Sequence, residues 1–130
     1  IPDSRVDEVL ELVELTEAAN KRTKNYSLGM KQRLALAGAI LGDPEVLILD
    51  EPANGLDPLG IAWLRKFLRS LAGSGRTILV SSHQLAEMQN TVDDVIIMHR
   101  GKLITSGSMK DIIKDGTLEE AFLKLTEGVN

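Results

Sequence analysis

Two adjacent carboxylates, Asp50 and Glu51, close a short apolar run and are followed by Pro52. Neighbouring side chains of a strand point to opposite faces, so both carboxylates can face one atom only if the chain turns there, and Pro52 favours a turn. One carboxylate could then hold a hard cation such as Mg²⁺, while the other orients or deprotonates a water molecule. For an isolated acid pair, the simpler interpretation is a solvated loop start at the end of a strand.

Three further short motifs carry groups that suit a phosphate. His83 follows a second apolar run, and its imidazole could donate to the charge that accumulates on a phosphate. Ser27 and Gly29 lie where a helix is predicted to begin, and the free amides of a helix N-terminus form an anion site. Asp57 lies in a turn that leads into a helix with Pro58 at its first position. Each motif alone also has a structural interpretation, as a cap or a turn, so only their order and spacing favour a common site.

Two apolar runs, 46–49 and 77–81, must position these groups. The first run is too short for a buried helix and too evenly apolar for an alternating surface strand, so we expect it to be a buried parallel strand. A helix pattern over 59–71 and a Gly-Ser-Gly breaker connect it to the second run, which we expect to be another such strand. Strand, helix and strand over this distance predict a βαβ unit, and parallel sheets bind ligands beyond the carboxyl ends of their strands.

The flanking segments predict an α/β domain with helices at both ends. A first helix is expected to be capped by Asp3 or Ser4 and to end near Leu15, and residues 16–26 are expected to form a loop. Ser27 is expected to cap a second helix, which stops at residues 42–44. The apolar positions expected on its buried side are Leu34, Leu36, Ala37, Ile40 and Leu41.

The C-terminal part is predicted to contain a short helix over about 84–90 and then a hairpin with strands at 95–98 and 103–104, joined at 100–102. His99 is interpreted as a hairpin residue without a catalytic role. Two small helices follow, and the last is expected to place three apolar side chains on one face, those of Leu118, Phe122 and Leu125.

Composition limits the class of protein. The 130 residues suit one domain, and 43% hydrophobic residues allow a core of ordinary size. A formal net charge of −4 gives no electrostatic basis for nucleic-acid binding, and the short basic segment 21–24 is interpreted as a solvated loop. The chain has no cysteine, so it has no disulfide framework and no thiolate metal site. It also shows no leader pattern and no apolar run of membrane-spanning length.

Four motifs in this order resemble the second half of an ABC-type ATPase, the nucleotide-binding subunit of ATP-driven transporters. The segment YSLGMKQR resembles the family's signature motif, and VLILDE resembles its Walker B strand with the adjacent catalytic glutamate. NGLDP is similar to the D-loop, SSH to the switch-histidine loop, and VIIMHRGKLITSGS to the closing segment. The segments EPANGLDPLG and GTLEEAFLKLT are most similar to ATPase subunits of drug, bacteriocin-immunity and ABC-2-type exporters.

The resemblance implies a fold and a set of site residues. The expected fold is a partial P-loop NTPase (RecA-like) parallel sheet with helices, together with part of the ABC helical subdomain. The cofactors implied are ATP and Mg²⁺. By position, the resemblance gives Asp50 a role in holding Mg²⁺ and Glu51 the role of general base. It gives His83 a contact with the γ-phosphate, and it gives Asp57 a link between two sites across a dimer. Ser27 and Gly29 are implied to contact the γ-phosphate of the partner subunit's ATP.

The signature segment departs from the common family pattern at two positions. Leu28 stands where the family usually has a glycine, and Met30 stands where it often has a glutamine. The leucine keeps the backbone amides but limits how closely the chain can approach a ligand.

The phosphate loop G-x-x-x-x-G-K-[ST] does not occur in the 130 residues. We therefore expect residues 1–130 to be the C-terminal part of one ABC ATPase domain, without the Walker A strand and inactive toward ATP by itself. The expected regions are a helical and signature region (1–42), a core from Walker B to the hairpin (43–107) and C-terminal helices (108–130). Since the missing strand would lie inside the sheet, we also expect uncovered apolar surface and self-association of the isolated chain.

The resemblance favours an exporter's ATPase subunit that works as a homodimer on a transmembrane permease, peripherally at the cytoplasmic face of the cell membrane, without nucleic acid. One alternative is a non-transport ABC ATPase in translation or chromosome maintenance. The chromosome type needs a long coiled coil before the signature, whereas residues 4–26 predict one short helix. Another alternative is a catalytically dead interaction module, which an upstream phosphate loop would argue against.

Overall fold

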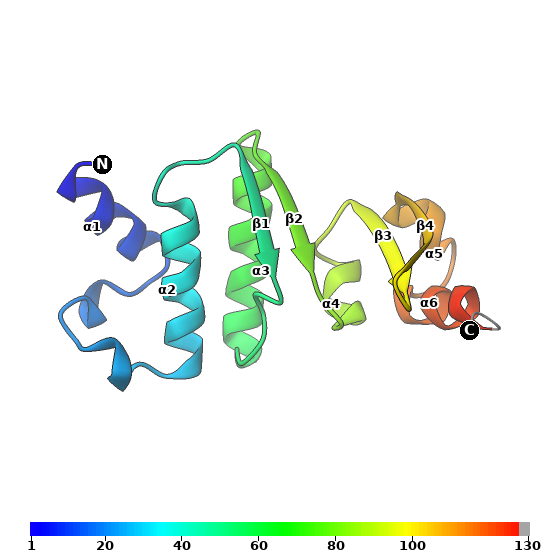
Figure 1. Cartoon of the computed structure of the whole chain (residues 1–130), viewed down its shortest axis with the longest axis horizontal. Helices are drawn as coiled ribbons and strands as arrows, with labels where there is room; N and C mark the ends of the chain where they lie inside the picture. Colours follow the sequence, from blue (N-terminus) through cyan, green and yellow to red (C-terminus); the bar gives the residue numbers. More distant parts are fainter. Residues whose placement is uncertain (128–130) are drawn as a thin grey trace. The chain divides into compact units, whose positions relative to one another are not determined.

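The computed structural model describes residues 1–127, and its helices and strands alternate through most of the chain (Figure 1). The chain divides into two units, residues 1–82 and the part from His83 onward. The first unit contains α1 (Asp3–Leu12), α2 (Leu28–Ile40), β1 (Val46–Asp50), α3 (Pro58–Gly73) and β2 (Thr77–Ser81), with short 3₁₀ turns at Thr16–Ala18 and Thr23–Asn25. The second contains α4 (Leu85–Gln89), β3 (Asp94–His99), β4 (Lys102–Ser108), α5 (Met109–Ile113) and α6 (Leu118–Thr126).

The predicted βαβ unit is confirmed. Strands β1 and β2 are parallel, with Val46 opposite Thr77 and Asp50 opposite Ser81, and α3 forms the crossover. Because the register is level, both strands end at the same edge of the sheet. The polar residues that close the two runs are therefore neighbours in space.

Burial of the β1–β2 sheet is one-sided, so the expectation that both apolar runs form buried strands is wrong for one face, where Leu79 of β2 is 53% exposed. Leu47 and Leu49 are buried in the cluster that includes Leu64 of α3. Val46 and Ile48 point the other way and are 59% and 73% exposed. The apolar run suits burial on both faces, but within residues 1–127 the helices cover only one face of this pair. Uncovered apolar surface was expected, and the self-association of the isolated chain stays a prediction.

Helix α1 begins and ends differently from the sequence prediction. The residue at its N-cap is Pro2, and no side chain caps it, so the predicted caps Asp3 and Ser4 lie inside the helix. The helix ends at Leu12 because the chain adopts a left-handed conformation at Glu14 (φ 61°). The amides of Glu14 and Leu15 donate to the carbonyls of Glu11 and Leu10, which is a Schellman ending with glutamate in the usual glycine position.

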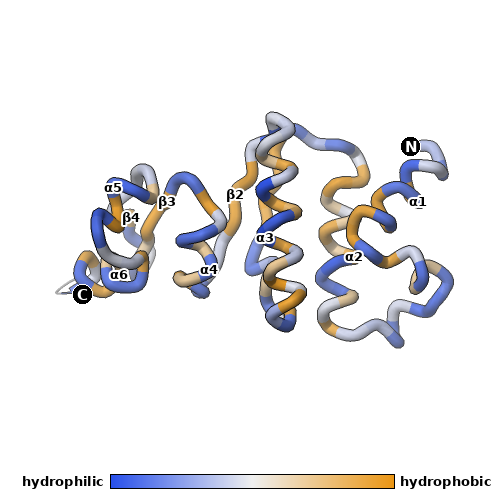
Figure 2. Tube along the Cα trace, turned by 180° about the vertical axis from the view of Figure 1, so that it is seen from behind, coloured by the Kyte–Doolittle hydropathy of each residue, from blue (hydrophilic) through white to orange (hydrophobic). Residues whose placement is uncertain are grey.

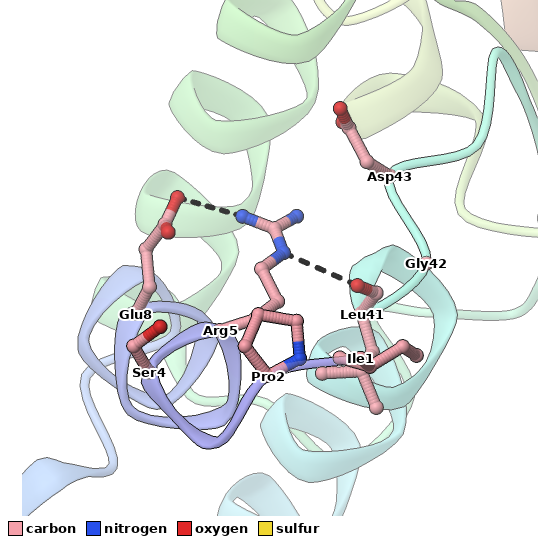
Figure 3. A pocket seen from close by; sticks show the side chains of 8 residues that line it. All are labelled: Ile1, Pro2, Ser4, Arg5, Glu8, Leu41, Gly42 and Asp43. Carbon is pink, nitrogen blue, oxygen red and sulfur yellow. Dashed lines mark hydrogen bonds and ion pairs between the residues drawn. The ribbon is translucent and has the colours of Figure 1, made fainter.

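Arg5 ties α1 to the C-terminal end of α2 (Figure 3). Its Nε donates to the carbonyl of Leu41 at 3.1 Å and its Nη2 to the carbonyl of Ile40 at 2.8 Å. Its Nη1 forms an ion pair with Glu8 at 2.7 Å. A positive side chain at a helix C-terminus satisfies free carbonyls and complements the helix dipole. Arg5 also lines an open pocket at this end of α2, beside Glu8 and Leu41, and its contacts there are those of a helix cap.

Arg33 joins three helices of the first unit. Its Nη1 donates to the carbonyl of Val13 at 3.3 Å and pairs with Glu14 at 3.1 Å. The guanidinium also lies 4.1 Å from the ring centroid of Trp63, which stacks on Phe67. The contacts of Arg33 hold the start of α2 in a fixed relation to α3.

The core of the first unit includes residues of α3. Figure 2 shows hydrophobic colour along β2 and recurring along α3, in agreement with the buried cluster around Leu64 and Leu68.

The second unit contains the predicted hairpin. Arg100 and Gly101 form a two-residue turn between β3 and β4, and a bulge interrupts the register at Ile97 and Met98. The small core of this unit is built on Ile97, Met109 and Leu118.

The last helix agrees with the prediction at Leu118 and Phe122, which belong to this small core. Leu125 lies seven residues after Leu118 in the same helix, so the three apolar side chains share one face as predicted, although Leu125 is 38% exposed. The last three residues of the region expected to form C-terminal helices, 128–130, lie outside the described residues. No helix within residues 1–127 is long and apolar enough to cross a membrane.

Candidate functional site

The carboxyl end of the β1–β2 pair brings together an acid and a hydroxyl. Asp50 is the last residue of β1, Ser81 is the last residue of β2, and the two are paired across the sheet. The hydroxyl of Ser81 donates to Oδ1 of Asp50. Both residues are exposed, so the Asp50 carboxylate is held in one place while it remains open to solvent.

Glu51 begins the turn that the acid pair predicted. Its backbone is left-handed, with φ 49°, and its carbonyl accepts from the amide of Asn54 at 3.1 Å. Its own amide donates to the carbonyl and to the hydroxyl of Ser81, each at 3.1 Å. A non-glycine residue in this region costs roughly 1–3 kcal/mol and persists only where the surroundings fix it. Ser81 therefore contacts both acids: its hydroxyl binds the Asp50 carboxylate, and its hydroxyl and carbonyl together bind the Glu51 backbone amide.

The N-terminus of α2 has the predicted cap. The Ser27 side chain accepts from the amide of Met30 at 3.1 Å, and Ser27 itself is exposed. Gly29 lies in the first turn of the helix, among the amides that have no partner within a helix. The positive end of the α2 dipole and an exposed hydroxyl thus meet at this point, which is the arrangement that suits an anion.

The turn from 54 to 57 connects the acid pair to α3. Asp57 caps α3, with its Oδ1 accepting from the amide of Gly60 at 2.8 Å, and Pro58 occupies the first helical position as predicted. The side chain of Gln32 donates to the carbonyl of Asn54 at 2.7 Å. The structure therefore brings the start of α2 and the turn before α3 together, two segments that the sequence only placed 22 residues apart.

His83 opens the second unit, two residues beyond the end of β2 and just before α4, and it is exposed. Its expected contact with a phosphate stays a prediction. His99 is the last residue of β3, and its ring lies 6.2 Å from that of Phe122 in an edge arrangement. Its interpretation as a hairpin residue is confirmed.

Comparison with known proteins identifies the family. The family model described as "ABC transporter" matches residues 1–54. A bacitracin transport ATP-binding protein of Enterococcus faecalis is 45% identical over 115 residues, which cover 88% of the chain and 37% of that protein. A lantibiotic transport ATP-binding protein of Streptococcus pyogenes is 39% identical over 122 residues, which cover 94% of the chain and 52% of that protein.

The chain belongs to the family of ABC transporter ATP-binding proteins.

The fold agrees with this assignment. A solved structure titled "Structure of ATP binding subunit of ABC transporter" superimposes with a TM-score of 0.84 at 29% identity, covering 97% of this chain and 56% of that chain. The chain thus has an α/β ABC ATPase fold, as the sequence predicted. It spans about a third to a half of the length of the curated relatives named here.

ABC ATPases use ATP with Mg²⁺, and the residues at the end of β1 fit this cation. Asp50 offers a hard oxygen donor that Ser81 holds in place. Within residues 1–127, no three acidic or histidine side chains gather into a metal cluster. Mg²⁺ bound through one carboxylate takes its other ligands from water and from nucleotide phosphates, which is its usual coordination in ATPases. The Asp50 carboxylate therefore fits a magnesium ion that takes its other ligands from water and nucleotide phosphates.

Sequence reasoning missed two residues of this site. Ser81 was assigned to the second strand and to the SSH segment but received no role of its own, although a polar residue at the carboxyl end of a parallel strand was the available signal. Gln32 gave no signal, because its partner is a backbone carbonyl of a distant turn.

Proposed function

We propose that the intact protein carrying this chain is the ATP-hydrolysing subunit of an ABC exporter. One observation carries the proposal: Ser81 of β2 holds Asp50 by its hydroxyl and Glu51 by its carbonyl at the shared carboxyl end of the two strands. This fixed acid pair suits hydrolysis of a phosphate bond, which depends on positioning a water molecule and neutralising charge.

The two acids have different roles in the proposal. Glu51 accepts the proton of the attacking water as a general base, and its left-handed backbone begins the turn that follows β1. Asp50 would hold Mg²⁺, which when bound neutralises charge on the phosphate oxygens of ATP. Ser81 orients the Asp50 carboxylate for this task.

The remaining site residues act on phosphate charge. Ser27 and Gly29 at the start of α2 would bind the γ-phosphate of ATP held by a second subunit, and the positive end of the helix supports this role. Asp57 would link the two sites of the dimer, and His83 would contact the γ-phosphate. In this arrangement each subunit completes the site of the other.

The proposed partners are a second copy of this ATPase subunit and a transmembrane permease, with the complex at the cytoplasmic face of the cell membrane. Relatives named for bacitracin and lantibiotic transport support an exporter, and they point to peptide antibiotics as the class of cargo.

Glu51→Gln tests the proposal in the intact protein. We expect turnover to fall about 10²–10⁴-fold while ATP stays bound, because the amide keeps the shape of the side chain but cannot take a proton. Phosphate release and retained nucleotide are measured on the same sample. Glu45→Gln is the matched control, since Glu45 is an exposed glutamate just before the opposite end of β1. Near-normal hydrolysis by Glu51→Gln would show that Glu51 is not the base.

A further inference from the structure

The start of α2 and the turn before α3 meet at one close contact, between Leu28 and Gly55. A β-carbon built on Gly55 would lie 2.5 Å from Cγ of Leu28 and closer still to its Cδ2. Gly55 also has a φ of +81°, a conformation that other residues rarely adopt. Glycine is therefore favoured at this position for two separable reasons, the backbone conformation and the space that Leu28 occupies.

The neighbouring residues extend this contact on both sides. Gln32 donates to the carbonyl of Asn54 at 2.7 Å, and a β-carbon built on Gly29 would lie 3.5 Å from Cδ2 of Leu56, which is an ordinary van der Waals distance. Successive residues of the turn thus meet the first residues of α2. Leu28 is nevertheless 58% exposed, so its side chain has the turn on one side and solvent on the other.

The contact lies between two helix caps that belong to the proposed site. Ser27 caps α2 directly before Leu28, and Asp57 caps α3 two residues after Gly55. Because Cγ as well as a terminal methyl of Leu28 occupies the space, clearing it requires rotation of the whole side chain or a shift of the α2 start. A shift of that start would move the hydroxyl of Ser27.

We propose that Leu28 and Gly55 form a steric pair that sets the spacing between the starts of α2 and α3, and that Leu28 is a positioning residue for Ser27 and Asp57. The pairing itself follows from the contact, whereas its effect on hydrolysis rests on the proposed function. An enlarged residue 55 is tolerated only if residue 28 becomes smaller.

The test is a cycle of Gly55→Ala, Leu28→Ala and the double variant in the intact protein. Leu28→Ala removes Cγ and Cδ2 and leaves Cβ, which would lie 3.5 Å from the new methyl group. Gly75→Ala is the matched control, because Gly75 has a φ of +95° and a β-carbon built on it meets nothing within 4 Å. Gly75→Ala therefore reports the backbone strain without the steric contact.

We expect Gly55→Ala to lower the thermal unfolding midpoint more than Gly75→Ala does. We also expect it to lower ATP turnover about tenfold or more, since small displacements of positioned groups have effects of this size. Adding Leu28→Ala should restore the midpoint to that of Gly75→Ala and recover most of the turnover. It should not rescue Gly75→Ala itself. If Gly55→Ala alone fails to fold and the double variant folds, Leu28→Ala has rescued folding, and this outcome also supports the steric pair.

Equal effects of Gly55→Ala and Gly75→Ala on the midpoint, or additive effects in the cycle, would overturn the steric pair, as would failure of the double variant to fold. If the two substitutions interact in the unfolding midpoint but act independently on ATP turnover, the steric pair stands and only the positioning role is overturned. If the unsubstituted protein does not hydrolyse ATP, the proposed function fails, while the coupling of unfolding midpoints still decides the steric pair.

Discussion

Two turns of this chain use the same backbone conformation for different purposes. Glu51 after β1 has a φ of 49°, and Arg100 after β3 has a φ of 51°, although neither residue is glycine. Arg100 is followed by Gly101 at φ 75°, and the two close a hairpin whose strands are adjacent in the chain. A turn with two positive φ angles matches the twist of a two-residue hairpin, so its conformation is explained by strand pairing alone.

The turn after β1 closes no hairpin. The chain leaves the sheet there, and the strand beside it arrives only after the α3 crossover. What fixes Glu51 is Ser81, a residue 30 positions away that also donates to Asp50. Positive φ at a non-glycine residue is thus not by itself a sign of function. A positive φ points to function where a polar side chain distant in sequence holds that residue and an acidic residue is adjacent, as at Glu51.

Among changes at these two turns, Asp50→Asn should have the largest effect on ATP turnover. If Asp50 holds Mg²⁺ through water, its loss should lower the apparent Mg²⁺ affinity about 10–100-fold, as for other groups outside the first coordination shell. The measurement is ATP turnover of the intact protein against Mg²⁺ concentration. Asp94→Asn, at an exposed aspartate that opens β3, is the control and should leave this dependence unchanged. The same Mg²⁺ dependence in Asp50→Asn would remove the metal role.

Ser81→Ala should have a smaller effect on the same turn. The carbonyl of Ser81 still accepts from the amide of Glu51, but the hydroxyl that donates to Asp50 and accepts from the same Glu51 amide is lost. We expect turnover to fall about tenfold, with about 1–2 kcal/mol of stability lost, because each hydrogen bond typically contributes about 1 kcal/mol. Turnover and urea unfolding are measured together. Ser106→Ala, at an exposed serine of β4, should change neither; an equal loss there would show that the effect is not specific to the acid pair.

Gly101→Ala tests whether the hairpin turn affects stability alone. A methyl group at φ 75° strains the hairpin turn, although nothing lies within 4 Å of the added carbon. We expect about 1–2 kcal/mol of destabilisation from the left-handed conformation, and no change in turnover below the unfolding transition. Gly101→Asn should recover part of the loss, because asparagine tolerates this conformation better. A fall in turnover of a folded Gly101→Ala protein would mean that the hairpin turn also serves the site.

Features that depend on neighbours in sequence were predicted correctly. The Ser27 cap, the Pro58 helix start, the second strand and the hairpin turn all follow from short-range backbone chemistry, and all are confirmed. The prediction failed at one face of the β1–β2 pair, where burial depends on which other elements are present to cover an apolar side chain. Asp3 and Ser4 failed as caps because Pro2 occupies the N-cap position, so the helix begins at Asp3.

The family, the βαβ unit and the order of the acid pair and the two helix caps could be predicted from the sequence, because periodicity, caps and turn residues act over a few residues. The folded structure was needed to show that Ser81 holds Asp50 and Glu51, that Gln32 reaches Asn54, and that Leu28 fills the space beside Gly55. These contacts join residues from 22 to 31 positions apart. Their formation depends on the parallel register and on the packing of α2 against α3, which no short stretch of sequence encodes.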